Sequence, residues 1–260
     1  LLFTVGQNTG HYCAPNETYD ELTGLRPSRC SRRDLIPELA EALEPHEVRL
    51  MVYTTAGPPN EPNAAEALGW ADPRNGPPRR LADFQQKWNR ILATWSRRWG
   101  RRVHGWWVDG CYFADAMYEF EDEPNWDSLT RALKSGNSDA IVAYNPGVRV
   151  PVITQGDEDY TAGELDRALA VGGWRDGAFR TVPSKVGGAQ YHVLTFLGQF
   201  WRVGEPRFPD ALAAGYTRFI VENGGAVTCD VPITETGSIP ERFVHQLRTV
   251  GREVDASRNR

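Results

Sequence analysis

Asp109 is the carboxylate whose sequence context best suits catalysis. It follows the largely apolar run Val103–Val108 and precedes Gly110, a residue that permits a tight turn. If this run is a strand of a (β/α) barrel, Asp109 lies at the strand's carboxyl end, where barrel active sites are built. Trp106 and Trp107 would then form a dry wall beside the carboxylate, and Tyr112 could donate a hydrogen bond to it. An Asp-Gly pair is equally typical of turns without catalytic function, and spacing alone does not separate the two interpretations.

A second group of acids lies in the segment Asp157–Glu164. Glycoside hydrolysis uses two carboxyl groups, one that attacks or activates water and one that protonates the leaving oxygen. Glu164 and Glu158 are candidates for the second group. The alternative is an acidic loop in which Thr161 or Asp159 caps a following helix, and the residues by themselves favour this alternative.

Several other polar side chains come directly after predicted strands, where they could bind sugar hydroxyl groups. Each is weak evidence alone, because a loop Asn or Asp more often stabilises a turn. His192 lies inside a predicted strand, where a single His is more often a hydrogen-bonded core residue than a base. The polar residues that follow or end strands are Gln7, Asn8, His11, Asn145, Thr228 and Asp230.

Composition excludes several classes of function. The chain has 260 residues, 40% hydrophobic residues and a net charge of -5. Its paired arginines stand beside acids or at helix ends, which indicates a solvated surface and no nucleic-acid partner. No apolar run approaches the roughly eighteen residues of a membrane span. We expect no metal or organic cofactor, since no HExxH motif or paired cysteines occur. Compartment and oligomeric state stay open.

Four cysteines are too few for a disulfide framework. Free thiols are the simpler interpretation, and a Cys13–Cys111 pair is an alternative.

Strands and helices alternate along the sequence, with long polar loops at 6–30 and 56–78. Ser31 is the expected N-cap of the first helix, which Pro45 ends. Apolar residues at helical spacing, from Phe84 to Trp99, predict a helix packed on the sheet. The expected strands are 1–5, 48–53, 103–109, 140–144, 150–154, 191–196 and 226–230. The other expected helices are 127–134, 163–169, 210–222 and 240–252.

This alternation predicts an α/β fold with a parallel sheet. Because the long loops follow strands, we expect a (β/α)8 TIM-type barrel that forms one catalytic domain over residues 1–260. Six or seven strands are recognisable, and the chain begins inside a strand pattern without Met. We therefore expect an incomplete N-terminal part that lacks the first strand or strands. No GxGxxG or GxxxxGK motif follows a strand to support a doubly wound fold.

Taken together, these segments resemble the α-L-fucosidase family of retaining glycoside hydrolases (family 29). The resemblance runs in order along nearly the whole chain, although no single motif is decisive. The run Val103–Gly110 is similar to the family's nucleophile strand, which reads apolar-Trp-Phe-Asp-Gly. The other similar segments are Arg33–Leu39 with Val48–Tyr53, the turn Leu197–Trp201, and Asn223–Pro232 with Gly237–Pro240.

The resemblance implies an exo-acting enzyme on a terminal α-L-fucoside-like sugar, with Asp109 as nucleophile and a covalent glycosyl-enzyme. A second carboxyl group would act first as acid and then as base. For that group we rank Glu164 first, Glu158 second and Glu205 third. The residues expected to bind the sugar are Gln7, Asn8, His11, Tyr53, Trp107, Tyr112, Asn145, His192 and Trp201.

Three departures from the family pattern are visible. Gly6–His11 stands where the family reads Lys-His-His-Asp-Gly-Phe, and Tyr191-His192 stands where one common pattern has Trp-Glu. The family's early His-Trp-Gly strand has no counterpart. A non-catalytic carbohydrate-binding relative is therefore the second hypothesis, and a purely structural barrel remnant is the third.

Overall fold

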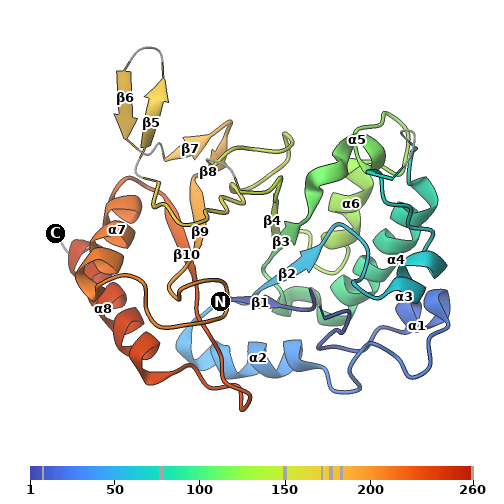
Figure 1. Ribbon diagram of the computed structural model, residues 1–260, viewed down its shortest axis with the longest axis horizontal. Coiled ribbons are helices and arrows are strands. Elements are labelled where there is room, and N and C mark those ends of the chain that lie inside the picture. Colours follow the sequence, from blue (N-terminus) through green and yellow to red (C-terminus); the bar gives the residue numbers. More distant parts are fainter. Residues whose placement is uncertain are drawn as a thin grey trace. The chain divides into compact units, whose positions relative to one another are not determined.

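The computed structural model describes residues 1–7, 9–75, 79–148, 151–170, 172–175, 178–181 and 184–258. The chain divides into two compact units, Leu1–Gly147 and Val148–Arg260. Figure 1 labels their helices and strands in chain order. Asn8, which we expect to bind sugar, lies outside the described residues.

The first unit is built on a parallel sheet whose four strands are neighbours in chain order. Helices or long loops separate these strands, as the alternation in the sequence predicts. The sheet register places Tyr53 opposite Trp107 and Thr55 opposite Asp109. The strands are β1 (Leu2–Thr4), β2 (Met51–Thr55), β3 (Gly105–Asp109) and β4 (Ile141–Tyr144).

One face of this sheet is covered by helices. The longest is α4 (Ala82–Trp99), whose buried stripe includes Trp88, Trp95 and Trp99. Trp99 stacks on Trp106 of β3, with 5.9 Å between the ring centroids. These tryptophans therefore pack the core, as their helical spacing predicts. The other helices of the unit are α1 (Glu17–Thr23), α2 (Leu35–Leu43), α3 (Pro62–Ala67), α5 (Ala114–Met117) and α6 (Trp126–Leu133).

Three expectations for this unit are wrong in detail. Asp34 caps α2 by accepting a hydrogen bond from the Ile36 backbone, so Ser31 is not the cap. The predicted loops 6–30 and 56–78 contain the short helices α1 and α3. These helices were missed because they are too short to show an apolar stripe, although Asn16 and Glu61 cap them with their side chains.

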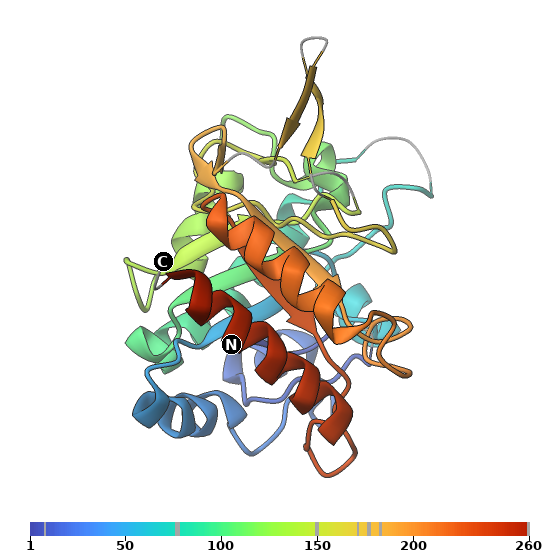
Figure 2. The same cartoon turned by 90° about the vertical axis from the view of Figure 1, so that its left-hand side faces the viewer.

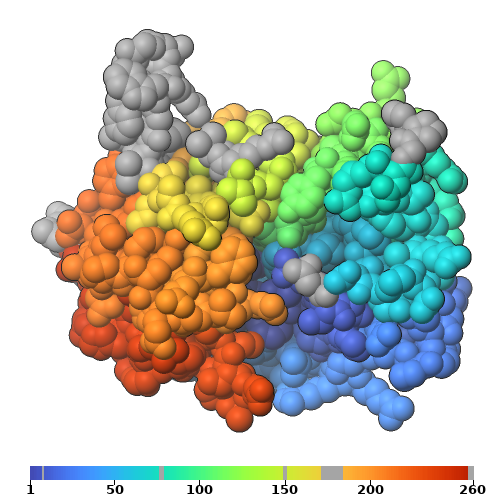
Figure 3. Space-filling view, in the orientation of Figure 1, coloured from blue at the N-terminus to red at the C-terminus, as the bar shows by residue number. Residues whose placement is uncertain are grey.

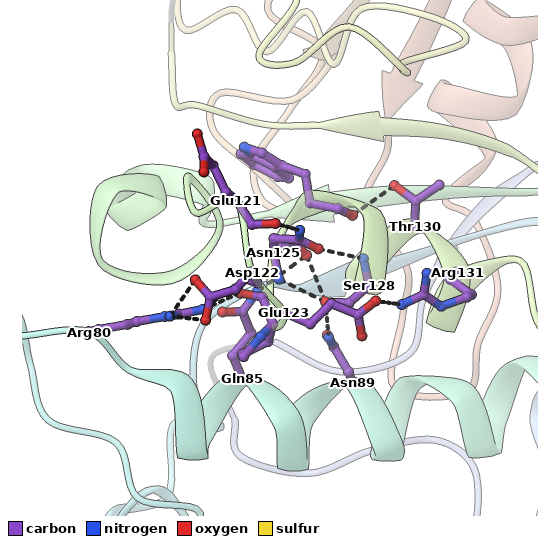
Figure 4. Close-up of polar contacts among 12 residues, drawn as sticks. Arg80, Gln85, Asn89, Glu121, Asp122, Glu123, Asn125, Ser128, Thr130 and Arg131 are labelled. Carbon is purple, nitrogen blue, oxygen red and sulfur yellow. Dashed lines mark hydrogen bonds and ion pairs between the residues drawn. The ribbon is translucent and has the colours of Figure 1, made fainter.

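Polar contacts join the chain between β3 and α6 to the residues before α4, and join α6 to α4 itself, as Figure 4 shows. Arg80 donates to both carboxylate oxygens of Asp122, at 2.8 and 3.0 Å. Asn125 caps α6 in a capping box with Ser128, and Asn89 of α4 donates to the Ser128 hydroxyl at 3.1 Å. The loop that follows Asp109 is therefore anchored at its far end.

The second unit contains the parallel pair β9 (His192–Phe196) and β10 (Ala226–Asp230). Two helices, α7 (Asp210–Glu222) and α8 (Glu241–Arg258), lie side by side, as Figures 1 and 2 show. Phe243 of α8 is fully buried against Leu197 and Ala213. Two antiparallel hairpins that the sequence analysis missed are β5 (Gly172–Arg175) with β6 (Ala178–Thr181), and β7 (Lys185–Val186) with β8 (Ala189–Gln190).

The predicted helix over 163–169 is wrong. Gly163 has φ +63°, and its carbonyl accepts from Leu194 N while Leu165 N donates to Leu194 O. The segment is thus extended along β9, because strand pairing offers its backbone better partners than a weak helix does. The predicted strand 150–154 is also wrong: residues 151–154 are irregular, and Val150 lies outside the described residues.

The predicted α/β class with parallel strands is confirmed in both units. Closure into an eight-stranded barrel, and a single domain over 1–260, stay predictions. All four cysteines are free, so the alternative of a Cys13–Cys111 bridge is wrong. Burial raises the pKa of Cys13, Cys30 and Cys229 to about 12 in each case, which leaves these thiols protonated and unreactive.

Candidate active site

Asp109 lies at the carboxyl end of β3, and five donors converge on its half-buried carboxylate. Oδ1 accepts from Gly110 N at 2.7 Å, Asn145 Nδ2 at 2.8 Å and the Tyr112 hydroxyl at 3.2 Å. Oδ2 accepts from the Tyr53 hydroxyl in a short hydrogen bond and from Gln7 Nε2 at 3.5 Å. A carboxylate that meets donors alone is held in a fixed orientation. The arrangement suits a nucleophile better than a simple turn residue.

The sheet itself explains why Tyr53 reaches Asp109. Side chains two residues apart on a strand share a face, so Trp107 and Asp109 point the same way and Tyr53 joins them from β2. The Tyr53 and Trp107 rings stack, with centroids 5.2 Å apart and planes 17° apart. Both are buried and lie outside the cluster that packs under the helices. They form an apolar floor beneath the carboxylate.

Asn145 and Tyr112 anchor the other side of the carboxylate. Asn145 follows β4, is fully buried and accepts from Gly147 N at 3.2 Å while it donates to Asp109. Gly147 has φ +100°, and a Cβ there would meet the Tyr112 ring at 3.2 Å. The phenol therefore rests against glycine backbone and stays 55% exposed. Of these two, Tyr112 is the one able to meet a ligand.

Gln7 comes from the loop after β1, in a turn that two glycines allow. A Cβ at Gly6 would overlap the Tyr12 ring at 2.4 Å, and Gly10 has φ +67° with Asn60 O only 2.8 Å from its Cβ position. The backbone is therefore closely packed at Gly6 and at Gly10. Gln7 is half-buried beside Asp109, as the strand-end pattern predicts.

His11, which we expect to bind sugar, makes contacts through both nitrogens of its ring. Its Nδ1 lies 3.0 Å from Thr9 O and its Nε2 lies 3.2 Å from Arg29 Nη1. The carbonyl requires a proton on Nδ1, so Nε2 accepts from the arginine. Arg29 in turn lies 3.6 Å from Glu61. His11 is exposed but both of its ring nitrogens are engaged within the first unit.

The second unit carries the predicted partner carboxylates. Glu158 is buried, and its Oε2 accepts from the Gln155 backbone at 2.9 Å and from the Thr154 backbone. It therefore closes its own loop. The alternative in which Thr161 or Asp159 caps a following helix is wrong, because the segment after them is extended and the Thr161 hydroxyl donates to His192 O. Glu164 is half-buried in the extended segment beside β9, where it bridges to Leu194. Glu205 is exposed and pairs with Arg242 at 2.8 Å. The role of acid and base stays a prediction for each.

His192 begins β9 and is fully engaged. Its Nδ1 donates to Thr161 O at 2.9 Å, and its Nε2 accepts from the Thr228 hydroxyl at 2.9 Å. Burial lowers its pKa to about 4, because the charged ring would lose its hydration. The geometry agrees with the core-histidine interpretation.

Aromatic residues gather at the carboxyl end of β9. Trp201 packs on Phe196 at 4.8 Å between centroids, and Phe200 is 51% exposed. Asp230 ends β10 and accepts from Arg202 N at 2.8 Å, while burial raises the pKa of its carboxyl group. Phe200 was not among the predicted residues, although its position in the turn Leu197–Trp201, which is similar to a segment of the α-L-fucosidase family, was a usable indication.

The loops after β2 and β3 form adjoining surface in the first unit. Trp70 lies 6.1 Å from Phe113 between ring centroids, and Arg74 lies over the same ring at 5.8 Å. Figure 3 shows these loops as neighbouring cyan and green areas. They line the same strand ends from which Asp109 projects.

A groove of about 950 Å³ lies at the opposite, amino-terminal ends of β2 and β3. Its arginines include Arg97 and Arg98 in the last turn of α4, where basic side chains offset the negative end of the helix dipole. This placement supports the solvated-surface interpretation of the arginine pairs. The groove lies away from the carboxylate and its donors.

Within the described ranges, no group of three or more His, Cys, Asp or Glu side chains could hold a metal ion. A search of the same residues finds no helix whose length and hydropathy suit a bilayer crossing.

No protein-family model and no curated protein sequence matches the chain. Solved structures do resemble it. Endo-fucoidan hydrolase MfFcnA4 of glycoside hydrolase family 107 has a TM-score of 0.73 at 14% identity, over 96% of this chain and 46% of that one. MfFcnA9, an endo-fucoidan hydrolase of the same family, has a TM-score of 0.73 at 14% identity, over 96% of this chain and 55% of that one. Alpha-L-fucosidase AlfC from Lactobacillus casei, solved in complex with its alpha-L-fucose product, has a TM-score of 0.60 at 14% identity. The match covers 100% of this chain and 76% of that one.

The chain thus has the α/β fold of these glycoside hydrolases, and it spans about half the length of the two endo-fucoidan hydrolases.

Proposed function

We propose that this chain is the catalytic part of a retaining glycoside hydrolase, with Asp109 as its nucleophile. The observation that carries the proposal is the carboxylate at the end of β3, held by five donors above the Tyr53–Trp107 floor. The likeness to fucose-processing glycoside hydrolases supports an α-L-fucoside-like sugar as substrate. Exo action on a terminal sugar draws support from the likeness to alpha-L-fucosidase AlfC alone, since the endo-fucoidan hydrolases are named for endo action.

In the proposed reaction, Asp109 attacks the anomeric carbon while a second carboxylic acid protonates the departing oxygen. Water then attacks the covalent intermediate, and the second group, now a carboxylate, takes its proton. Glu164 is the first candidate for that group and Glu158 the second. Tyr112, Gln7 and Trp201 are the proposed sugar ligands with accessible surface. Tyr53 and Trp107 support the nucleophile instead of binding the sugar directly.

Replacing the nucleophile tests this proposal. Asp109→Asn should lower kcat on aryl α-L-fucosides, galactosides and arabinosides by about a thousandfold or more, since the covalent step is lost. Asp139→Asn, at an exposed carboxylate of the same unit that pairs with Arg101, should leave kcat unchanged. In Asp109→Ala, azide should restore turnover and yield a glycosyl azide of inverted configuration. Undiminished activity in Asp109→Asn would contradict the mechanism.

The second candidate function is carbohydrate binding without catalysis. His192 stands where one family pattern has its acid/base Glu, and Glu158 closes its own loop. Calorimetric titration with the sugars of the same panel separates the two functions. A folded chain that binds a sugar but turns over none of the glycosides would favour the binding protein.

A further inference from the structure

The two oxygens of Asp109 are held unequally. Oδ1 has three donors within 3.2 Å: Gly110 N, Asn145 Nδ2 and the Tyr112 hydroxyl. Oδ2 has one strong donor, the Tyr53 hydroxyl, and one at the limit of hydrogen bonding, Gln7 Nε2 at 3.5 Å. The difference decides which oxygen can attack.

An attacking oxygen needs a lone pair that points at the anomeric carbon. Each carboxylate oxygen offers about two lone-pair sites. Three donors occupy both sites of Oδ1, whereas Tyr53 occupies one site of Oδ2 and only the long contact from Gln7 covers the other. Withdrawal of one side chain, Gln7, would therefore free a lone pair on Oδ2, and no comparable single step frees one on Oδ1.

On the basis of the proposed function, we infer that Asp109 attacks through Oδ2 and that Gln7 leaves this oxygen to bind the sugar hydroxyl next to the anomeric carbon. Gln7 is thereby a specificity-determining residue for a 2-hydroxy sugar.

The chemistry of the amide fits this role. Its oxygen has no hydrogen-bond partner among the described residues, and its nitrogen has only the 3.5 Å contact. An amide both donates and accepts, so it can pair with a hydroxyl without a proton transfer. Gly6, directly before Gln7, is closely packed against the Tyr12 ring, so rotation of the Gln7 side chain is the change that the exchange requires. A hydrogen bond to the 2-hydroxyl group also strengthens in the transition state of glycoside hydrolysis.

A lone pair of Oδ2 forms the bond to the anomeric carbon as the bond to the leaving oxygen breaks, and the leaving oxygen takes a proton from the second carboxylic acid. In the second step, water bonds to the anomeric carbon, its proton passes to the second carboxylate, and the electron pair of the broken bond returns to Oδ2. Gln7 exchanges hydrogen bonds only.

The test compares Gln7→Ala with wild type on two aryl glycosides of the same sugar, one with the 2-hydroxyl group and one without it. Gln7→Ala should lower kcat/KM about tenfold to hundredfold on the hydroxylated substrate and less than about threefold on the 2-deoxy substrate. Thr9→Ala is the matched control in the same loop, because among the described residues its hydroxyl forms hydrogen bonds with the His11 backbone alone. It should change neither value more than about threefold.

Equal losses on both substrates in Gln7→Ala would overturn the inference while leaving the proposed function intact. Should that variant be unstable, Gln7→Met keeps the approximate size of the side chain without its amide and should show the same contrast between substrates. A folded wild-type chain inactive on every glycoside would overturn the proposed function, and this inference with it.

Discussion

At the scale of single residues, the candidate site depends on how one carboxylate is surrounded. Asp109 meets donors from four segments: the loop after β1, strand β2, its own turn and the residue after β4. Donors that are already in place can stabilise the changing charge on the carboxylate as it forms a bond, without having to reorganise. Preorganised sites lower activation barriers in this way. Tyr53 and Tyr112 offer a direct comparison, because each donates a phenol hydrogen to a different oxygen.

Removal of these two hydroxyl groups should have unequal effects. Tyr53→Phe should lower kcat about tenfold to a hundredfold, because Oδ2 loses its one strong donor. Tyr112→Phe should cost less than about tenfold, since Oδ1 keeps Gly110 N and Asn145. Steady-state kinetics of both variants across pH would measure this. A larger loss in Tyr112→Phe would argue that Oδ1 is the reacting oxygen.

At the scale of elements, the first unit relies on close contact between α4 and the turn after α6. Ser96 of α4 donates to Leu133 O at 2.6 Å and accepts from Gly136 N at 2.9 Å. A Cβ at Gly136 would lie 1.8 Å from Ser96 O, so only glycine fits between the two elements. The same helix supports β3 from beneath through Trp99 and Trp106, and thereby the position of Asp109.

Gly136→Ala should therefore lower the free energy of unfolding by about 2–4 kcal/mol, through overpacking against backbone that cannot rotate away. Gly57→Ala is the control in the same unit, as a Cβ there meets nothing within 4 Å. Its effect should stay within about 1 kcal/mol. Urea titrations followed by tryptophan fluorescence would measure both. Equal stabilities of the two variants would show that the turn relaxes more easily than its contacts suggest.

At the scale of the whole molecule, buried titratable groups set how stability depends on pH. His192 joins Thr161 to Thr228 as a neutral ring, and burial holds its pKa at about 4, below its unfolded value of 6.5. Between these two values the unfolded chain binds more protons, so stability must rise with pH. This contribution is complete above pH 6.5 and is lost progressively as pH falls toward 4.

Because of His192, the free energy of unfolding should be about 2 kcal/mol lower at pH 5 than at pH 7.5. His192→Gln should flatten that part of the pH dependence, whatever its effect at neutral pH. His46→Gln, at an exposed histidine, should not. Denaturation curves of wild type, His192→Gln and His46→Gln at pH 7.5 and pH 5 would measure the change in the free energy of unfolding. An unchanged slope in His192→Gln would mean that the ring is charged in the folded chain or titrates normally.

Features that depend on local periodicity could be predicted from the amino-acid sequence. Alternating apolar strands and amphipathic helices are physical consequences of side-chain spacing, so the parallel α/β class, the stripe of α4 and the position of Asp109 at a strand end could all be predicted. The short helices α1 and α3 were not predicted, because one or two turns are too short to show a periodic pattern of apolar residues. The 163–169 segment was misassigned because pairing with Leu194 outweighs a weak helical preference.

Tertiary structure alone decided which groups meet. Tyr53 and Asp109 are far apart in sequence, and only the register of β2 against β3 brings the phenol onto Oδ2. The same holds for Asn145 and Gln7, whose reach depends on where β4 and β1 end. It also holds for His192, whose neutral state follows from burial between Thr161 and Thr228. Hydrogen bonds and burial depend on distances across the fold, and a linear pattern does not contain them.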